Sequence, residues 1–391
     1  MVIIALFSGL IFFPLIGKIT NRGASNIDVF RLREKRNPSQ YPPLPVTVEN
    51  ISSFPSVYEE AFNDNLPFRE LFIKFNSDIL LKIFNSSPHK QLLIGKNNHC
   101  FLASHANGTN DLIFSSIEIT EQRILEISQY LKDKKSFLED LNVPVIMLSI
   151  PTSPLLDFSN IPYGIQKEID LSFLKKPPMQ RVIDNMPQEY SQKYLLFPYE
   201  RILKANDEYP LFPSKNFHWS ISRYTKLTAS CIAEKFGIEP YEKPRLDEFE
   251  IQKTVSDLSN FAGTKIYNKN DLVYKEGVWE KLNISDMNIA DVYNRCPEYP
   301  CKYTVNPDKV GKLLLVGDSY TPFLRFDLAR HFGEIVSVNF NMSRHNPNTE
   351  LWMKCLFEDI KPDYIVFIAH NVFLVYPEFI ETYYSILKPK I

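Results

Sequence analysis

The segment Lys312–Tyr320, KLLLVGDSY, places a serine directly after a run of apolar residues. The apolar run has the length of a short buried strand, and Thr321–Phe332 has the apolar spacing of a helix. Gly317 would permit a sharp turn between them. A serine on such a turn stands exposed at the carboxyl end of a parallel sheet. We therefore predict that Ser319 is a nucleophile, the simpler interpretation being a turn in which Asp318 bonds its own backbone.

A serine hydroxyl needs a base to accept its proton, and that base is usually a histidine. Among seven histidines, His218 stands out because it lies in a loop, SKNFHWS, directly before a predicted helix at Ile221–Phe236. Its neighbour Trp219 is one of three tryptophans, and Ser220 is placed to cap the helix. We predict that His218 is the general base, with a structural histidine as the alternative.

Strand-like and helix-like segments alternate around these residues. Such alternation predicts a parallel sheet that is covered on both faces, with its ligand site beyond the carboxyl ends of the strands. Ser319, His370 and the loop Pro151–Pro154 fall at such ends. The other predicted strands are Val143–Ile150, Leu195–Phe197, Ile335–Phe340 and Tyr364–Ala369, and the helices are Thr120–Leu141, Gln180–Tyr194 and Thr349–Glu358.

The N-terminal part of the chain predicts an attachment to a membrane. Val2–Ile16 is apolar and uncharged, although shorter than the roughly 20 residues of a typical spanning helix. We expect a signal anchor at 1–17, with a buried N-terminal strand or helix as the alternative, and a proline-rich tether at 18–53. One domain, 54–391, would follow, opening with a helical segment, Phe54–Phe84, that Pro67 divides in two.

Composition excludes some classes of function. The 391 residues are 44% hydrophobic, which suffices for a large core, and the net charge of −2 argues against nucleic-acid binding. Among five cysteines, Cys296 and Cys301 are close enough for a small disulfide loop in an oxidising compartment. They lack the second ligand pair of a zinc site. Buried thiols are expected at the other three, Cys100, Cys231 and Cys355.

Five blocks, taken in order, resemble the membrane-associated alginate O-acetyltransferase family (AlgX/AlgJ-like). They are FPSVYEEAFNDNLPFRELFI, LLIGKNNHCFL (a predicted hairpin), SKNFHWS, LLVGDSY and KPDYIVFIAHN. The resemblance implies an α/β fold, a three-layer α/β/α SGNH-hydrolase-like (flavodoxin-like) parallel sheet with an N-terminal membrane-anchor helix and a helical lead-in. It also implies acetyl transfer through an acyl-serine to a polysaccharide hydroxyl, without metal or cofactor.

The resemblance further implies a periplasmic domain on the inner membrane, with acetyl groups supplied by a membrane-bound acyl-transporting protein of the MBOAT type. Carried over by position, Ser319 is the nucleophile and His218 the base. The family places an aspartate two residues before the histidine, where this chain has Asn216. We assign Asn216 to orient His218, and keep Asp318 and Asp207 as alternative acids.

An acyl-serine also needs donors for its oxyanion. Candidates are the backbone N–H groups of Ser319 and Tyr320, the Tyr320 side chain and Arg344, whose alternative is a solvated surface charge. Trp219 and Tyr320 are candidates for stacking on sugars. Three functions remain open: a polysaccharide O-acetyltransferase, an acetylesterase using the same residues, and a non-catalytic polysaccharide-binding or assembly subunit, which the missing carboxylate at Asn216 would explain.

Overall fold

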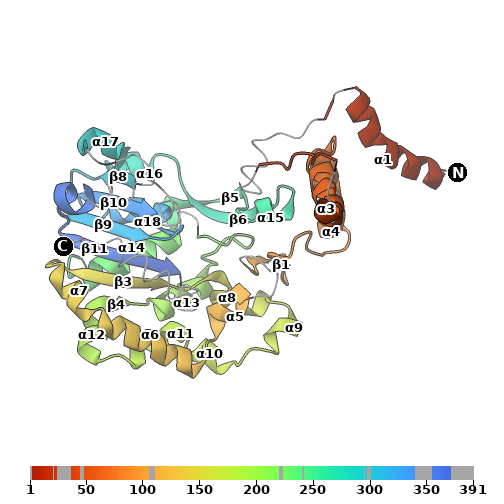
Figure 1. The fold of residues 1–391 in the computed structure, drawn as a ribbon. Coiled ribbons are helices and arrows are strands. Elements are labelled where there is room, and N and C mark those ends of the chain that lie inside the picture. The colour runs from red at the N-terminus through yellow and green to blue at the C-terminus, as the bar shows by residue number, and fades with distance from the viewer. Residues whose placement is uncertain are drawn as a thin grey trace. The chain divides into compact units, whose positions relative to one another are not determined.

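The computed structural model describes most of the chain and divides it into two compact units (Figure 1). One unit comprises Met1–Leu92 and Ser259–Ile266, and the other comprises Leu93–Leu258 and Tyr267–Ile391. The described residues are 2–20, 22–23, 37–44, 48–104, 111–219, 223–239, 242–294, 296, 301–339 and 355–370.

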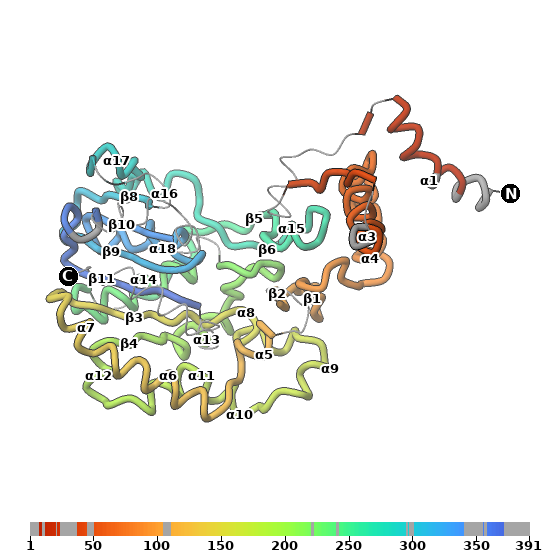
Figure 2. The backbone as a smooth tube through the Cα atoms, in the orientation of Figure 1, coloured from red at the N-terminus to blue at the C-terminus, as the bar shows by residue number. Residues whose placement is uncertain are grey.

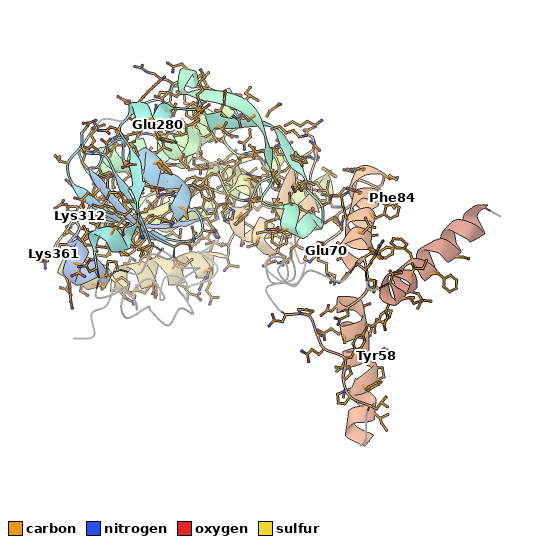
Figure 3. All side chains as sticks on the ribbon, turned by 90° about the horizontal axis from the view of Figure 1, so that it is seen from above. Tyr58, Glu70, Phe84, Glu280, Lys312 and Lys361 are labelled. Atoms are coloured by element: carbon orange, nitrogen blue, oxygen red, sulfur yellow. A yellow bond between two sulfur atoms is a disulfide. The ribbon has the colours of Figure 1, made fainter. Side chains whose placement is uncertain are left out.

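The first unit is helical. It contains α1 (Val2–Ile19), α3 (Val48–Asp64), α4 (Arg69–Lys82) and α15 (Ser259–Ala262). The break predicted at Pro67 is confirmed, and α3 begins within the segment predicted as a tether. Tyr58 and Phe84 keep exposed rings in this unit (Figure 3). Within the part of the chain that the structure describes, no helix is both long and apolar enough to cross a membrane.

A seven-stranded sheet forms the centre of the second unit. The strand order is β4 (Leu195–Leu196), β3 (Val145–Ile150), β11 (Tyr364–His370), β9 (Lys312–Gly317), β10 (Glu334–Asn339), β8 (Cys301–Val305) and β7 (Ser285–Met287). The first five strands are mutually parallel, which confirms the mixed α/β class. The prediction of a purely parallel sheet is wrong at one edge, because β8 pairs antiparallel with both β10 and β7.

Both faces of this sheet carry helices. Leu314 and Val316 of β9 belong to one core cluster with apolar residues of four helices. These helices are α6 (Glu121–Asp133), α7 (Lys135–Asp140), α11 (Pro178–Asp184) and α12 (Gln188–Tyr194). Leu313 and Leu315, equally buried, point to the opposite face because side chains alternate along a strand. There α18 (Thr321–Leu328) packs against β9, β10 and α14 (Arg223–Lys235).

Several predicted helices are shorter than expected. Thr120–Leu141 forms two helices, α6 and α7, and Gln180–Tyr194 forms α11 and α12, with Pro187 starting the second. Proline at that position lacks the N–H that would continue the preceding helix. Of the predicted helix Thr349–Glu358, only residues 355–358 lie in the described part, within a π-helix at Cys355–Ile360.

Two hairpins accompany the central sheet. The predicted one is present as β1 (Leu92–Ile94) and β2 (Cys100–Leu102). The other joins β5 (Phe249–Val255) and β6 (Tyr267–Tyr274) as an antiparallel ribbon of its own, visible in Figure 2. The sequence predicts irregular or short β structure for Asn260–Val278, which contains β6, and it predicts no strand at β5. Most β5 side chains are exposed, so the ribbon lacks the apolar pattern that marks a buried strand.

The predicted cysteine pairing is wrong. Cys296 is bonded to Cys355, with their Cα atoms 5.3 Å apart, while Cys301 is free and buried at the start of β8. Cys355 is therefore not the free thiol that we expected, whereas Cys100 and Cys231 are free and buried. Burial raises the pKa of the Cys100 thiol to about 11.

Reducing this disulfide is expected to lower the free energy of unfolding by about 2–4 kcal/mol, because the bond closes a long loop in the unfolded chain. The two cysteines are 59 residues apart in sequence, and β8, β9, α18 and β10 lie between them. Urea unfolding with and without a reductant measures the change, with Cys296→Ala/Cys355→Ala as the comparison. A non-reducing peptide map that links Cys296 to Cys301 would contradict the pairing.

Candidate active site

The turn that carries Ser319 follows β9 and leads directly into α18. Gly317 ends the strand without a positive φ, so it is not required there for a left-handed turn. Its role is steric, since a Cβ would lie 2.5 Å from the Ile368 carbonyl oxygen and 2.5 Å from Thr321 Oγ1. The absence of a side chain lets β11 approach the turn closely, which corrects the reason that the sequence suggested.

Asp318 braces this turn from below. Its side chain is 2% exposed, and its two oxygens accept the N–H groups of Tyr320 and His370, each at 2.9 Å. The carboxylate therefore joins the turn that carries Ser319 to the end of β11. The turn interpretation of Asp318 is confirmed, and its two oxygens face backbone groups instead of the His218 ring. Asp207, the other alternative acid, is exposed on α13 (Tyr199–Glu208).

Ser319 and His218 come together although 101 residues separate them. Ser319 Oγ lies 2.7 Å from His218 Nε2, and His218 Nδ1 lies 2.8 Å from Asp257 Oδ2. A carboxylate can only accept, so Nδ1 carries the proton and Nε2 accepts the serine O–H. The side chains of His218 and Asp257 are 25% and 30% exposed, so solvent reaches this chain of hydrogen bonds.

Asp257 is a candidate functional residue that the sequence did not predict. It lies just beyond β5, and its carboxylate accepts the backbone N–H groups of Phe217 and His218, each at 2.9 Å. The histidine loop thus wraps around the acid that faces its ring. An aspartate in a polar loop, VSDLSN, carries no local signal of such a role. Only the recognition of β5 and β6 as a hairpin would have drawn attention to it.

The assignment of Asn216 as the group that orients the ring is wrong. Its Oδ1 accepts the Asp257 backbone N–H at 3.2 Å and an Asn268 Nδ2–H at 2.9 Å. Asn216 therefore contacts the backbone of the loop that carries the acid, while Asp257 itself faces the imidazole.

The two aromatic candidates for sugar stacking are packed inside the protein. Trp219 and Tyr320 are both 0% exposed. Trp219 Nε1–H donates to the Tyr320 carbonyl at 3.2 Å, and the Tyr320 hydroxyl donates to the Phe217 carbonyl at 2.7 Å. They join the loop that carries His218 to the turn that carries Ser319, and neither offers a ring face to a ligand. A partly exposed ring, Phe323, lies 5.9 Å from the His218 ring between centroids.

The predicted oxyanion donors fare differently. The Tyr320 N–H is already used by Asp318, and burial raises the pKa of the Tyr320 hydroxyl well above its usual value, so it stays a neutral donor to Phe217. None of the described residues accepts a hydrogen bond from the Ser319 N–H, so this group is available to donate to an oxyanion. Arg344 lies outside the described residues. His370 is 7% exposed and lies beside Asp318 beneath the turn, with 3.7 Å between Nε2 and Oδ2.

Gly317→Ala is expected to lower the free energy of unfolding by about 1–3 kcal/mol, because the new methyl group overpacks the turn against β11. The same displacement would shift Ser319 and reduce turnover. Thermal unfolding and ester hydrolysis measure the two effects. Gly164→Ala in α9 (Tyr163–Gln166) is the matched control, since nothing lies within 4 Å of its Cβ position. Equal stability of the two variants would refute the steric role of Gly317.

These features define a class: an α/β protein with a serine, a histidine and an aspartate in hydrogen-bonding sequence at the carboxyl edge of its sheet. No family model matches the chain, and no curated protein matches it.

Several solved structures are similar at low identity. PatB1 of Bacillus cereus has 14% identity and a TM-score of 0.44, over 72% of this chain and 96% of that one. A DHHW family protein from Eubacterium siraeum has 11% identity and a TM-score of 0.44, over 73% and 92%. The O-acetyltransferase domain of Pseudomonas putida AlgJ has 14% identity and a TM-score of 0.39, over 77% and 99%.

Proposed function

We propose that this protein is an O-acetyltransferase that passes an acetyl group through Ser319 to a hydroxyl of an exported polysaccharide. The observation that carries the proposal is the unbroken sequence of contacts from Ser319 Oγ to His218 Nε2 and from His218 Nδ1 to Asp257. Such a relay activates a serine for acyl transfer. The choice of acetyl group and polysaccharide follows the family resemblance of the five sequence blocks, as does the SGNH-hydrolase-like assignment.

The first half-reaction forms the acyl-enzyme. Ser319 Oγ attacks the acetyl carbonyl of the donor while His218 Nε2 takes the serine proton. Asp257 stabilises the imidazolium that results, and the Ser319 N–H is placed to donate to the developing oxyanion. His218 then returns the proton to the leaving group, and the acetyl group remains on Ser319 as an ester.

The second half-reaction uses the same groups in reverse. His218 removes a proton from the acceptor hydroxyl, whose oxygen attacks the acetyl-serine carbonyl. Collapse of the intermediate releases the acetylated acceptor and restores the Ser319 hydroxyl. We place this chemistry on the periplasmic side of the inner membrane, with an N-terminal anchor and an acetyl donor presented by a membrane-bound acyl-transporting protein of the MBOAT type.

A second candidate is an acetylesterase, in which water replaces the sugar hydroxyl. The partial exposure of His218 and Asp257 favours it, because water reaches the base. The binding-subunit interpretation depended on a histidine without a carboxylate partner, and the contact with Asp257 removes that reason.

The test is acetylation of the full chain by p-nitrophenyl acetate, followed by intact mass and peptide mapping. We expect one acetyl group on the peptide that contains Ser319, and its transfer to an added oligosaccharide in preference to release as acetate. Release as acetate alone, with the oligosaccharide unmodified, would favour the esterase. No turnover and no acetyl-serine in the folded chain would refute both enzymatic proposals.

A further inference from the structure

Asp257 lies at the end of the β5–β6 ribbon, so the contacts that fix this end of the ribbon also fix the position of its carboxylate. Asp257 follows β5, and among the strands that the structure describes β5 pairs only with β6. Val255, the last residue of β5, is 51% exposed, whereas Leu258, directly after Asp257, is 1% exposed. The Asp257 carboxylate accepts two backbone N–H groups of the histidine loop, and its own backbone is fixed by further polar contacts.

Asn216 and Asn268 provide those contacts. Asn216 Oδ1 accepts the Asp257 N–H and an Asn268 Nδ2–H. Asn268 Oδ1 in turn accepts the Lys215 N–H at 2.8 Å, and the Asn268 side chain is 1% exposed. The two amides therefore connect the histidine loop to both strands of the ribbon. The Ser256 hydroxyl adds a further hydrogen bond to the Lys215 carbonyl.

The chemistry of the two amides suits this place better than carboxylates would. Asn268 donates through Nδ2 and accepts through Oδ1, which a carboxylate cannot do. At 216, a carboxylate would put a second negative charge beside Asp257, and like charges at close range disfavour ionisation of both. An amide offers the same accepting oxygen without that charge. Asparagine at 216 is thus matched to an acid located at 257.

We propose that Asn216 and Asn268 are positioning residues that hold Asp257 against His218, and that asparagine is required at 216 because the acid of this site comes from the hairpin. The proposal rests on acyl transfer through Ser319. Neither amide touches the reacting atoms, so both act through the geometry of Asp257.

The experiment compares the pH dependence of kcat/KM for p-nitrophenyl acetate in the full chain. Asn216→Ala and Asn268→Ala are each expected to lower kcat/KM by about 10- to 100-fold, the cost of a misplaced catalytic group. Both should move the acid limb of the profile to lower pH, because a loosened carboxylate stabilises the imidazolium less. Asn216→Asp should move the same limb to higher pH, because it adds negative charge near the ring.

Asn270→Ala is the matched control, because Asn270 is an exposed amide on β6, the strand that carries Asn268. This variant should leave the pH profile of kcat/KM unchanged. If Asn216→Ala does not fold, Asn216→Asp still carries the test, since it keeps the accepting oxygen. The proposal would be overturned if the acid limb of the pH profile did not move in the folded Asn216 variants. It would also be overturned if Asn216→Asp and Asn216→Ala moved that limb in the same direction. If Ser319→Ala keeps full turnover, the proposed function itself fails, and this outcome is distinct from an effect confined to the amides.

Discussion

Ser319→Ala is expected to abolish acetyl transfer, with kcat falling by about 10⁶, as in a serine protease that loses its nucleophile. Among the residues that the structure describes, Ser319 is the only hydroxyl that contacts His218 Nε2, with its Oγ 2.7 Å away. The fold should tolerate the change, because the Asp318 carboxylate holds the turn through backbone groups. The measurement is the rate of p-nitrophenol release together with the mass of the protein after exposure to the ester.

The matched control is Ser86→Ala, an exposed serine in the helical unit, which should keep both the rate and the adduct. Ser319→Cys should retain an acyl adduct, because a thiolate can also attack the ester. If Ser319→Ala is still acetylated at the wild-type rate, the nucleophile is another residue. This conclusion does not depend on the peptide map of the wild type.

Asp257→Asn is expected to lower kcat by about 10⁴, the loss seen when a triad aspartate becomes an amide. The amide NH₂ would face His218 Nδ1, favouring the tautomer whose Nε2 carries the proton and cannot accept one from Ser319. Asparagine has nearly the same shape as aspartate, so the packing around the 2.8 Å contact with His218 Nδ1 should change little. The main change is in which ring nitrogen of His218 carries the proton. Burst kinetics with the chromogenic ester would report acylation directly.

Two other aspartates serve as comparisons for this prediction. Asp207→Asn changes an exposed side chain and should leave kcat unaffected. Asp318→Asn should instead disturb the turn, lowering stability as well as rate, since it changes a buried carboxylate that accepts two backbone N–H groups. In Asp257→Ala, added formate should restore part of the rate by occupying the vacated place. Wild-type kcat in Asp257→Asn would remove this residue from the mechanism.

The parallel strands were predictable because each is a short apolar run buried on both faces. Leu313–Val316 and Tyr364–Ala369 are such runs, and both occupy the centre of the sheet. The antiparallel edge strands β7 and β8 were not predicted. Ser285–Met287 is exposed throughout and Cys301–Val305 alternates with polar residues, so neither shows an apolar run.

Within the site, the local features around Ser319 and His218 could be predicted from the sequence alone. The strand, Gly317 and the short polar segment after it place Ser319 on a strand-to-helix turn, and the block around His218 singles out one histidine among seven. These are short-range patterns, in which the residues that make the signal are also those that make the structure.

The carboxylate that contacts His218 and the contact of Asn216 with its backbone could be found only in the folded chain. Asp257 lies 39 residues from His218, on a ribbon held by side-chain amides and by backbone N–H groups. Such contacts produce neither a regular spacing of residue types nor a distinctive local composition, so nothing in the local sequence marks them. The same holds for Cys296 and Cys355, whose pairing depends on where the chain returns after 59 residues. Folding brings Asp257 into contact with both His218 and Asn216, and the residue types alone do not predict these contacts.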